Sequence, residues 1–201
     1  MAELLTELFS SRVRAAVLGC LLLRPHLRFS LTELSRRLDL PISSLQHECY
    51  KLERMGILIA RREGGSRRYR PEPRCPVLAP LTRLVAGAIG PAATLRGALE
   101  GLEGLELAYV AGTDVTAATP TSLPLLLVLV GEIPLEALDA ALNRSLAALG
   151  FEPGQIDLAF YRPDDWHARI AEGHPLVRKL LSGPYLDVTP VTPVTSEAVS
   201  V

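Results

Sequence analysis

The segment from Ile42 to Met55, ISSLQHECYKLERM, carries two different sets of side chains. Leu45, Cys49 and Leu52 recur at i, i+4 and i+7, which predicts a helix that packs this stripe on neighbouring helices. The other face presents hydroxyl, amide, imidazole and cationic groups, the types that reach phosphates and base edges when a helix lies in a major groove. We expect five of its residues to approach nucleic acid: Ser43, Ser44, Gln46, His47 and Lys51.

Basic side chains crowd the segment that follows, ILIARREGGSRRYR (57–70). Its two β-prone stretches are joined by Gly64 and Gly65, which can take the positive φ that a tight hairpin requires. Five guanidinium groups around a short turn repel one another, and a phosphate backbone is the simplest partner that would relieve this repulsion. These arginines are therefore also expected to contact nucleic acid: Arg61, Arg62, Arg67, Arg68 and Arg70.

Two helices are predicted before these segments. Apolar residues recur at helical spacing in SRVRAAVLGCLLL (11–23), and Pro25 ends this helix. LTELSRRLDL (31–40) has leucines on one face, and either Ser30 or Thr32 can cap its start. The helices bring the polar segments together by packing their apolar stripes into one core.

This order of elements, helix, helix, turn, helix and basic hairpin, resembles the winged helix-turn-helix of ArsR-like transcription regulators of bacteria and archaea. The resemblance covers residues 8–74, and its most specific parts are SLTELSRRLDLPISSLQHECYKLERMGIL and RREGGSRRYR. It implies a domain that binds double-stranded DNA, commonly as a two-fold dimer on paired half-sites. Metal-sensing members carry clustered Cys ligands in a helix. Here Cys20, Cys49 and Cys75 are far apart in the sequence, so no metal site is expected.

The second half of the chain predicts a small α/β unit. LELAYVAG (105–112), LPLLLVLVG (123–131) and QIDLAFYR (155–162) are predicted strands, and PLEALDAALNRSLAALG (134–150) is a predicted helix. The continuous apolar character of the second strand predicts burial on both faces. With the tail YRPDDWHARIAEGHPLVRKLL, this order resembles the minimal nucleotidyltransferase domain that some prokaryotic regulators carry behind a winged helix. The resemblance covers residues 91–183.

That resemblance also shows which catalytic groups are missing. Active members have an Asp-x-Asp pair on the second strand, because carboxylates at i and i+2 project to one side and hold Mg²⁺. Leu123 and Leu125 occupy those positions here, and leucine ligates no metal. Asp114 follows the first turn and Asp157 falls near the third acidic position, but isolated carboxylates do not make a two-metal site. No catalytic residue, cofactor or metal is expected.

Charge divides the chain in the same way. Residues 1–75 hold 14 Lys and Arg against 8 Asp and Glu, a net charge of +6, whereas the remaining residues sum to −7. This division suggests that only the first part meets a polyanion. The longest apolar run, residues 123–130, is far shorter than the roughly 20 residues that span a bilayer, and the N-terminus resembles no signal peptide. A cytoplasmic protein that binds no membrane is expected.

The segment between the two halves, 76–102, is divided by Gly90-Pro91 into two helical pieces. Its first piece has a broad apolar face, and this face either forms a dimer contact or packs onto the protein's own domains. Both alternatives are open from the sequence. The face consists of Leu78, Leu81, Leu84, Val85, Ala88 and Ile89. The final segment alternates Pro, Thr and Val without a period that could bury a face, so it is predicted to be disordered.

The sequence therefore predicts an α+β protein in four parts. They are a winged-helix DNA-binding domain (8–74), a helical linker with a dimer contact as one option (75–102), a degenerate nucleotidyltransferase-like domain (103–186) and a disordered tail (187–201). The expected function is that of a homodimeric transcription regulator, not an enzyme, whose second domain supports dimerisation or senses a small-molecule or nucleotide effector. Two alternatives remain: a nucleotidyltransferase with displaced metal ligands, and a protein-interaction module that binds no DNA.

Overall fold

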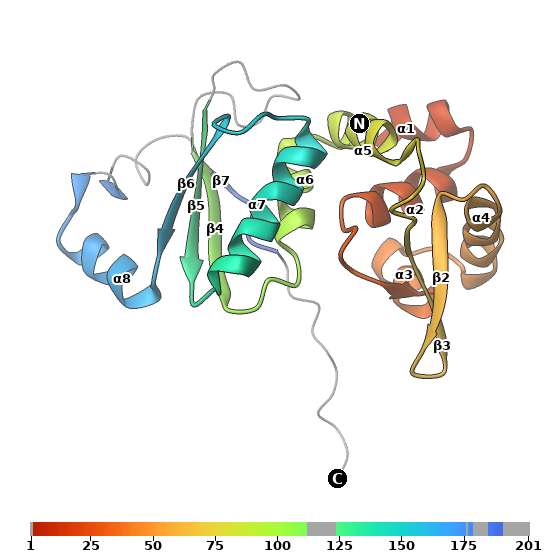
Figure 1. Cartoon of the computed structure of the whole chain (residues 1–201), viewed down its shortest axis with the longest axis horizontal. Coiled ribbons are helices and arrows are strands. Elements are labelled where there is room, and N and C mark those ends of the chain that lie inside the picture. The colour runs from red at the N-terminus through yellow and green to blue at the C-terminus, as the bar shows by residue number, and fades with distance from the viewer. Residues whose placement is uncertain (1, 112–123, 176, 179–184, 191–201) are drawn as a thin grey trace, which may run out of the picture.

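A computed structural model of the chain describes residues 2–111, 124–175, 177–178 and 185–190. Within these residues the protein belongs to the α+β class, as expected, with eight helices and two β-sheets (Figure 1). Each half of the chain contains one of the two sheets. None of the helices in the described residues is long and apolar enough to cross a membrane.

The first half combines four helices with a small sheet. Its elements are α1 (Ala2–Phe9), α2 (Arg12–Leu22), β1 (Phe29–Ser30), α3 (Leu31–Leu38), α4 (Ile42–Arg54), β2 (Leu58–Glu63) and β3 (Ser66–Pro71). The strand order is β1-β3-β2, and both pairings are antiparallel. Gly64 and Gly65 take the expected positive φ, 56° and 78°, so they form the turn of the β2–β3 hairpin.

Side-chain caps place these helices where the sequence predicts them. Ser11 accepts a hydrogen bond from the backbone N–H of Arg14 at 3.2 Å and begins α2. Ser30 and Glu33 form a capping box at the start of α3, which satisfies two backbone N–H groups. Asp39, with a left-handed φ of 51°, ends α3 and leaves only a short turn before α4. The α3–α4 pair is thus set by local hydrogen bonds.

One core joins the elements of the first half. The predicted stripe Leu45, Cys49 and Leu52 is fully buried there. The core also contains Leu5 of α1, which is 2% exposed, so the packed unit begins before residue 8. The sequence did not predict α1. Its packing extends the expected first domain toward the N-terminus.

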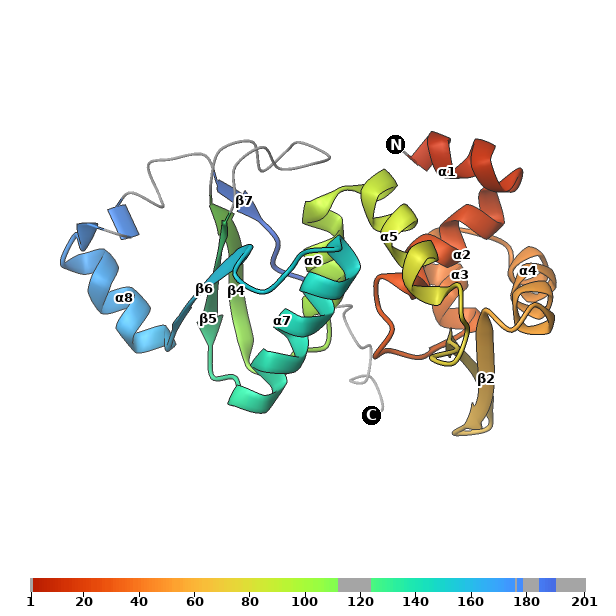
Figure 2. The ribbon, with the colours of Figure 1, turned by 45° about the horizontal axis from the view of Figure 1, so that its top comes forward.

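The second half forms a four-stranded mixed sheet between helices. Its elements are α5 (Leu78–Ile89), α6 (Pro91–Leu99), β4 (Leu105–Ala111), β5 (Leu125–Gly131), α7 (Leu135–Leu149), β6 (Ile156–Tyr161), α8 (Pro163–Ala171) and β7 (Tyr185–Asp187). The order is β6-β5-β4-β7; β5 and β6 are parallel, and the other pairs are antiparallel. Helices α6 and α7 cover one face, and α8 lies on the other (Figures 1 and 2). Strand β5 is buried on both faces, as predicted.

The apolar face of α5 packs within its own chain. Val85 and Ala88 are buried in the core of the first half, and Leu78, Leu81 and Ile89 pack against that core. Of the six residues of this face, Leu84 is the one left exposed, at 43%. Of the two alternatives for this face, the structure therefore favours packing onto the protein's own domain.

The residues after β7 differ from the expected tail. Val188 is fully buried, and the Thr189 hydroxyl accepts a hydrogen bond from the backbone N–H of Ala108 at 2.9 Å. The prediction of disorder from residue 187 is wrong for residues 187–190, because this short segment pairs with β4 and inserts an apolar side chain beneath it. The rest of the predicted tail, 191–201, lies outside the described residues.

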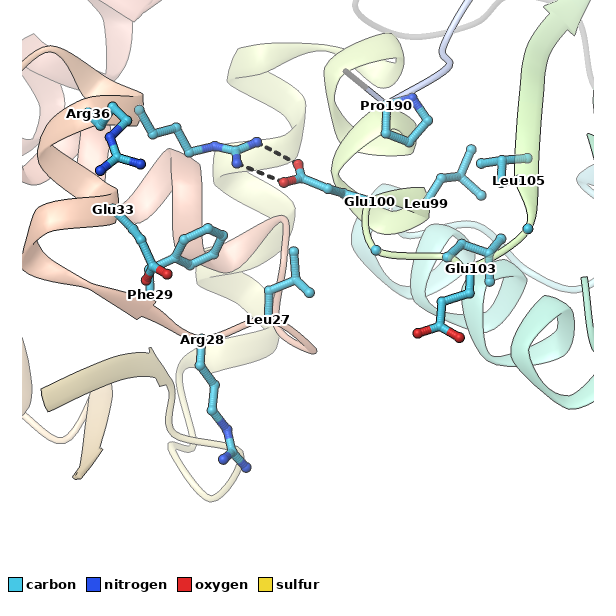
Figure 3. Close-up of a pocket in the computed structure, with 14 residues that line it drawn as sticks. Leu27, Arg28, Phe29, Glu33, Arg36, Leu99, Glu100, Glu103, Leu105 and Pro190 are labelled. Atoms are coloured by element: carbon cyan, nitrogen blue, oxygen red, sulfur yellow. Dashed lines mark hydrogen bonds and ion pairs between the residues drawn. The ribbon is translucent and has the colours of Figure 1, made fainter. Parts of the chain in front are cut away.

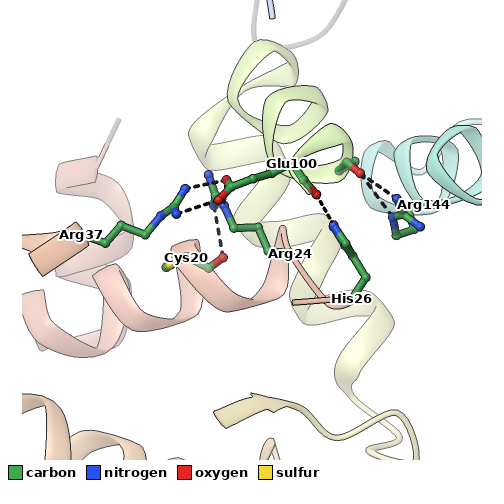
Figure 4. A network of polar contacts seen from close by, with 7 residues as sticks. Cys20, Arg24, His26, Arg37, Glu100 and Arg144 are labelled. Atoms are coloured by element: carbon green, nitrogen blue, oxygen red, sulfur yellow. Dashed lines mark hydrogen bonds and ion pairs between the residues drawn. The ribbon is translucent and has the colours of Figure 1, made fainter. Parts of the chain in front are cut away.

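A buried carboxylate connects the two halves. Glu100, at the end of α6, accepts a hydrogen bond from Arg24 Nε at 2.6 Å and two from Arg37, at 2.7 and 2.5 Å (Figure 4). Its side chain is only 7% exposed. Burial alone would raise the pKa of Glu100, but the hydrogen bonds from Arg37 and Arg24 outweigh this, so the pKa is lowered. We call Arg24, Arg37 and Glu100 the interdomain clamp.

His26 adds a second contact at the same place. Its Nε2–H donates to the backbone carbonyl of Glu100 at 2.6 Å, and its Nδ1 is buried without a hydrogen-bond partner. Burial lowers the pKa of His26, while the hydrogen bond to Glu100 acts in the opposite direction. The guanidinium groups of Arg144 and Arg24 also lower the pKa, and the Glu100 carboxylate raises it. His26 is therefore held neutral between the two halves.

Removing the clamp carboxylate should destabilise the protein strongly. A Glu100→Ala substitution leaves two partly buried guanidinium groups without their acceptor, and we expect a loss of about 3 kcal/mol in the free energy of unfolding. Urea titration of both proteins measures this loss. The matched control is Glu103→Ala in the next loop, an exposed carboxylate, which should change stability by less than about 0.5 kcal/mol. Equal losses of stability in the two variants would contradict the stabilising role of the interdomain clamp.

His26 should make stability depend on pH. In the unfolded chain His26 binds a proton near pH 6.5, but in the folded chain it does so only at lower pH. The stability that neutral His26 contributes is therefore complete above pH 6.5, and it is lost as the pH falls below 6.5 toward the lower pKa of the folded state. A His26→Gln variant keeps an N–H donor for the Glu100 carbonyl but binds no proton. Urea titrations at pH 7 and pH 5 should show a smaller loss of stability in the variant. An equal loss in both proteins would mean that His26 does not cause the pH dependence of stability.

Candidate nucleic-acid interface

The predicted contact face of α4 is accessible. Ser43, Gln46 and His47 are exposed, whereas Leu45 and Cys49 on the opposite side lie in the core. Ser44 is half-buried at the edge of the exposed face. The helix therefore presents hydroxyl, amide and imidazole groups outward on a rigid, fully packed support.

Two further residues belong to this face, and the predicted contacts omit them. Tyr50 is 57% exposed, and Arg54 is exposed one turn further along the helix. Both lie at helical spacing from Gln46 and His47, so the periodicity that identified the face also places them on it, although they are not among the five expected contacts. They extend the accessible polar surface to the C-terminal end of α4.

Glu48 holds α4 in place from its buried side. Arg14 Nε donates to this carboxylate at 3.0 Å, and another guanidinium N–H of Arg14 donates to the carbonyl of Phe9 at 3.2 Å. Lys51 Nζ donates to Glu48 at 3.3 Å. Burial alone would raise the pKa of Glu48, but the hydrogen bonds from Arg14 and Lys51 outweigh this effect and lower the pKa. Lys51 is therefore partly engaged within the chain, and it lies at the edge of the contact face.

The hairpin register places arginines opposite one another. Arg61 pairs across the strands with Arg68, and Arg62 pairs with Arg67. Directly opposed residues of an antiparallel pair lie on the same face, and like charges at these positions are destabilising. Each face of the hairpin thus carries one pair of repelling guanidinium groups near its turn.

Two of these arginines are neutralised within the chain. Arg67 Nη2 donates to both carboxylate oxygens of Glu53 on α4, at 2.7 and 2.5 Å. Arg68 Nη2 donates to Glu33 on α3 at 2.9 Å. Arg67 and Arg68 therefore have carboxylate partners within the chain, and their expected contact with nucleic acid stays a prediction. These two residues attach the hairpin to the helices.

The remaining hairpin arginines have no such partner. Arg61 and Arg62 are exposed, and among the described residues neither has a hydrogen bond or an ion pair from its side chain. Arg70 is half-buried, and its Nε lies buried without a hydrogen-bond partner. Arg61 and Arg62 are thus the members of the predicted set that are most available to an anionic partner.

The second half brings no catalytic group together at the predicted positions. Leu125 is 2% exposed and packs in the core beneath the sheet. Asp157 lies opposite Leu126 in the parallel register, hence on the other face from Leu125. Leu123 and Asp114 lie outside the described residues. Among the residues that are described, no group of three His, Cys, Asp or Glu side chains could hold a metal ion.

The cysteines are free thiols in the described chain. Cys20 and Cys49 are buried, and Cys75 is partly exposed between β3 and α5. Burial raises the pKa of Cys20, and it raises the pKa of Cys49 to about 12. Both buried thiols are therefore protonated at neutral pH and pack as small apolar side chains.

No protein-family model, curated protein or solved structure was found to match this chain. Function therefore has to be inferred from the side chains and their geometry. The accessible face of α4 and the unpaired arginines of the adjacent hairpin are the strongest such features. Both belong to the half of the chain that carries the positive net charge.

Proposed function

We propose that this protein is a DNA-binding transcription regulator with a winged helix-turn-helix domain. In this proposal α3 and α4 are the helix-turn-helix, α4 enters the major groove, and the β2–β3 hairpin is the wing. The order of α2, β1, α3, α4, β2 and β3 supports it, with β1 paired to β3. The short turn between α3 and α4, in which Asp39 ends α3, supports it further. In a helix-turn-helix the second helix lies in the major groove and the first crosses the DNA backbone, so the turn must hold the two helices together.

The main support for the proposal is that two accessible polar surfaces lie on consecutive elements of the chain, α4 and the β2–β3 hairpin. Ser43, Gln46 and His47 face outward from α4, and Arg61 and Arg62 lie without partners on the hairpin that follows it. The hairpin projects beyond the helices of this half (Figure 1). Amide and imidazole groups can read base edges, and guanidinium groups bind phosphates or enter the adjacent minor groove.

The second half is proposed to be a degenerate nucleotidyltransferase-like domain that supports regulation. Its mixed sheet, with α7 as the crossover between parallel β5 and β6, agrees with the element order expected of that domain. Leucine at position 125 offers no metal ligand. We assign this half no reaction, and its proposed contribution is ligand sensing or dimerisation.

Homodimer formation is part of the proposal. Leu4 and Leu8 are 60% and 55% exposed, and they lie one turn apart on α1. Leu84 of α5, which packs beside α1, is also exposed. A second copy of the chain would cover these leucines, and two-fold symmetry would present two copies of α4 to paired half-sites.

Arg61 and Arg62 should contribute directly to the salt dependence of DNA binding. Each lost phosphate contact reduces the slope of log affinity against log salt by about one unit, so the double variant Arg61→Ala/Arg62→Ala should reduce it by about two. Fluorescence anisotropy with duplex fragments selected from genomic DNA measures the slope. No binding at low salt, or an unchanged slope in the double variant, would overturn the proposal.

Two further variants make this experiment specific. Arg83→Ala removes an exposed arginine of α5 and should leave the slope unchanged. Gln46→Ala should also keep the slope but weaken the preference for the selected sequence, by about 1–3 kcal/mol if the amide contacts a base. A Gln46→Ala protein that retains full sequence preference would contradict the assignment of α4 to the groove.

Dimer formation should depend on the exposed leucines of α1. Sedimentation at several concentrations should show a dimer that the double variant Leu4→Glu/Leu8→Glu converts to monomer, because two carboxylates would then be buried in the contact. The matched control, Leu135→Glu, changes a leucine of α7 that is 73% exposed and should remain dimeric. A wild-type protein that sediments as a monomer at every concentration would exclude the dimer.

A further inference from the structure

A cavity of about 860 Å³ lies between the two halves of the chain (Figure 3). One wall comes from residues 27–29 and from α3. The opposite wall comes from the end of α6, the loop before β4 and Pro190. This volume is within the range of sites that bind small molecules, so the cavity is large enough for a ligand that contacts both halves.

Six of the side chains that line the cavity are apolar, and six are charged. The apolar ones are leucines, one phenylalanine and one proline, which favour a ligand with an apolar body because its contact with them releases water. The residues that form this part are Leu27, Phe29, Leu99, Leu102, Leu105 and Pro190.

The α3 end of the cavity carries one guanidinium group without a carboxylate partner among the described residues. Arg36 lies on the α3 wall (Figure 3), and its neighbour in the sequence, Arg37, pairs with Glu100. Arg24 and Arg37 both donate to Glu100, so the charge of this carboxylate is already compensated within the chain. Arg36 has no hydrogen bond or ion pair from its side chain to any described residue. It is therefore the group available to an incoming anion.

The other charged side chains of the wall are engaged or point elsewhere. Glu33 accepts a hydrogen bond from Arg68, and Arg28 forms an ion pair with Glu63. Glu103 points away from the end of the cavity that holds Arg36 (Figure 3). No described carboxylate of the wall is thus left unpaired beside Arg36.

We propose that this cavity is an effector site for an apolar molecule with one carboxylate, which binds Arg36. A planar guanidinium group matches a carboxylate with two parallel hydrogen bonds, and a single free arginine suits one such group better than a multiply charged phosphate. Binding connects the two halves, because each supplies a wall and α3 carries both Arg36 and the clamp residue Arg37. The link from this site to DNA affinity rests on the proposed function, whereas ligand binding itself does not.

Equilibrium dialysis of the full chain against octanoate tests the site. Octanamide is the uncharged match, and it should bind about tenfold more weakly, since it lacks the charge-assisted hydrogen bonds. Arg36→Gln should weaken octanoate binding about tenfold and leave octanamide binding unchanged. The control Arg74→Gln, an exposed arginine that does not line the cavity, should bind both probes like the wild type.

A filling variant tests the location of the site. Leu102→Trp adds volume to the apolar wall and should abolish binding of both probes, with urea titration confirming that the variant folds. Failure of octanoate to bind the wild type, equal octanoate binding by wild type and Arg36→Gln, or retained binding by folded Leu102→Trp would each overturn the site.

Dialysis contains no DNA, so this inference and the proposed function can fail separately. With octanoate at saturation, the DNA affinity of the wild type should change at least about threefold, while that of Arg36→Gln at the same concentration should change less. Octanoate binding without a change in DNA affinity would remove the regulatory link. A chain that binds octanoate but no DNA would overturn the proposed function and leave the effector site in place.

Discussion

A carboxylate with two guanidinium partners determines how the halves of this protein meet. Glu100 is nearly inaccessible to solvent, and its charge would be costly to bury without the hydrogen bonds from Arg24 and Arg37. Arg24 follows α2 and Arg37 belongs to α3, so the same contact restrains two elements of the first half. The backbone carbonyl of Glu100 restrains a third segment through His26. This ionic contact therefore restrains α3 and the two walls of the cavity between the halves.

The basic hairpin shows how a protein can carry opposed arginines and remain folded. Glu53 of α4 neutralises Arg67, and Glu33 of α3 neutralises Arg68. Each ion pair relieves repulsion within the hairpin and also orients it toward a helix of the proposed helix-turn-helix. Arg61 and Arg62, across the strands, remain without carboxylate partners in the described chain. Structural attachment and the proposed anion binding are thus divided between the two strands.

Local features of the sequence predicted individual helices and turns, whereas contacts between residues far apart in the sequence could not be predicted. The cap at Ser30, one of two expected candidates, the Gly64-Gly65 turn and the buried stripe of α4 depend on neighbours in the sequence, and all were confirmed. Helix α1 was not predicted, although Leu4, Leu5, Leu8 and Phe9 lie at helical spacing. That Leu5 and Phe9 reach the core while Leu4 and Leu8 stay exposed depends on packing against α2 and α5. The ion pairs of Glu53, Glu33 and Glu100 join residues 14 to 76 positions apart, which only tertiary packing brings together. The burial of Val188 likewise depends on the edge of β4.

The unequal burial of the three cysteines has a practical consequence. Cys20 and Cys49 are enclosed in the first core with raised pKa values, whereas Cys75 is partly accessible in the segment that leads from the hairpin to α5. A maleimide dye or a nitroxide would therefore attach preferentially at this junction, without any engineered cysteine. The natural chain thus offers a single reporter position from which the movement of the hairpin relative to the rest of the molecule can be followed by spectroscopy.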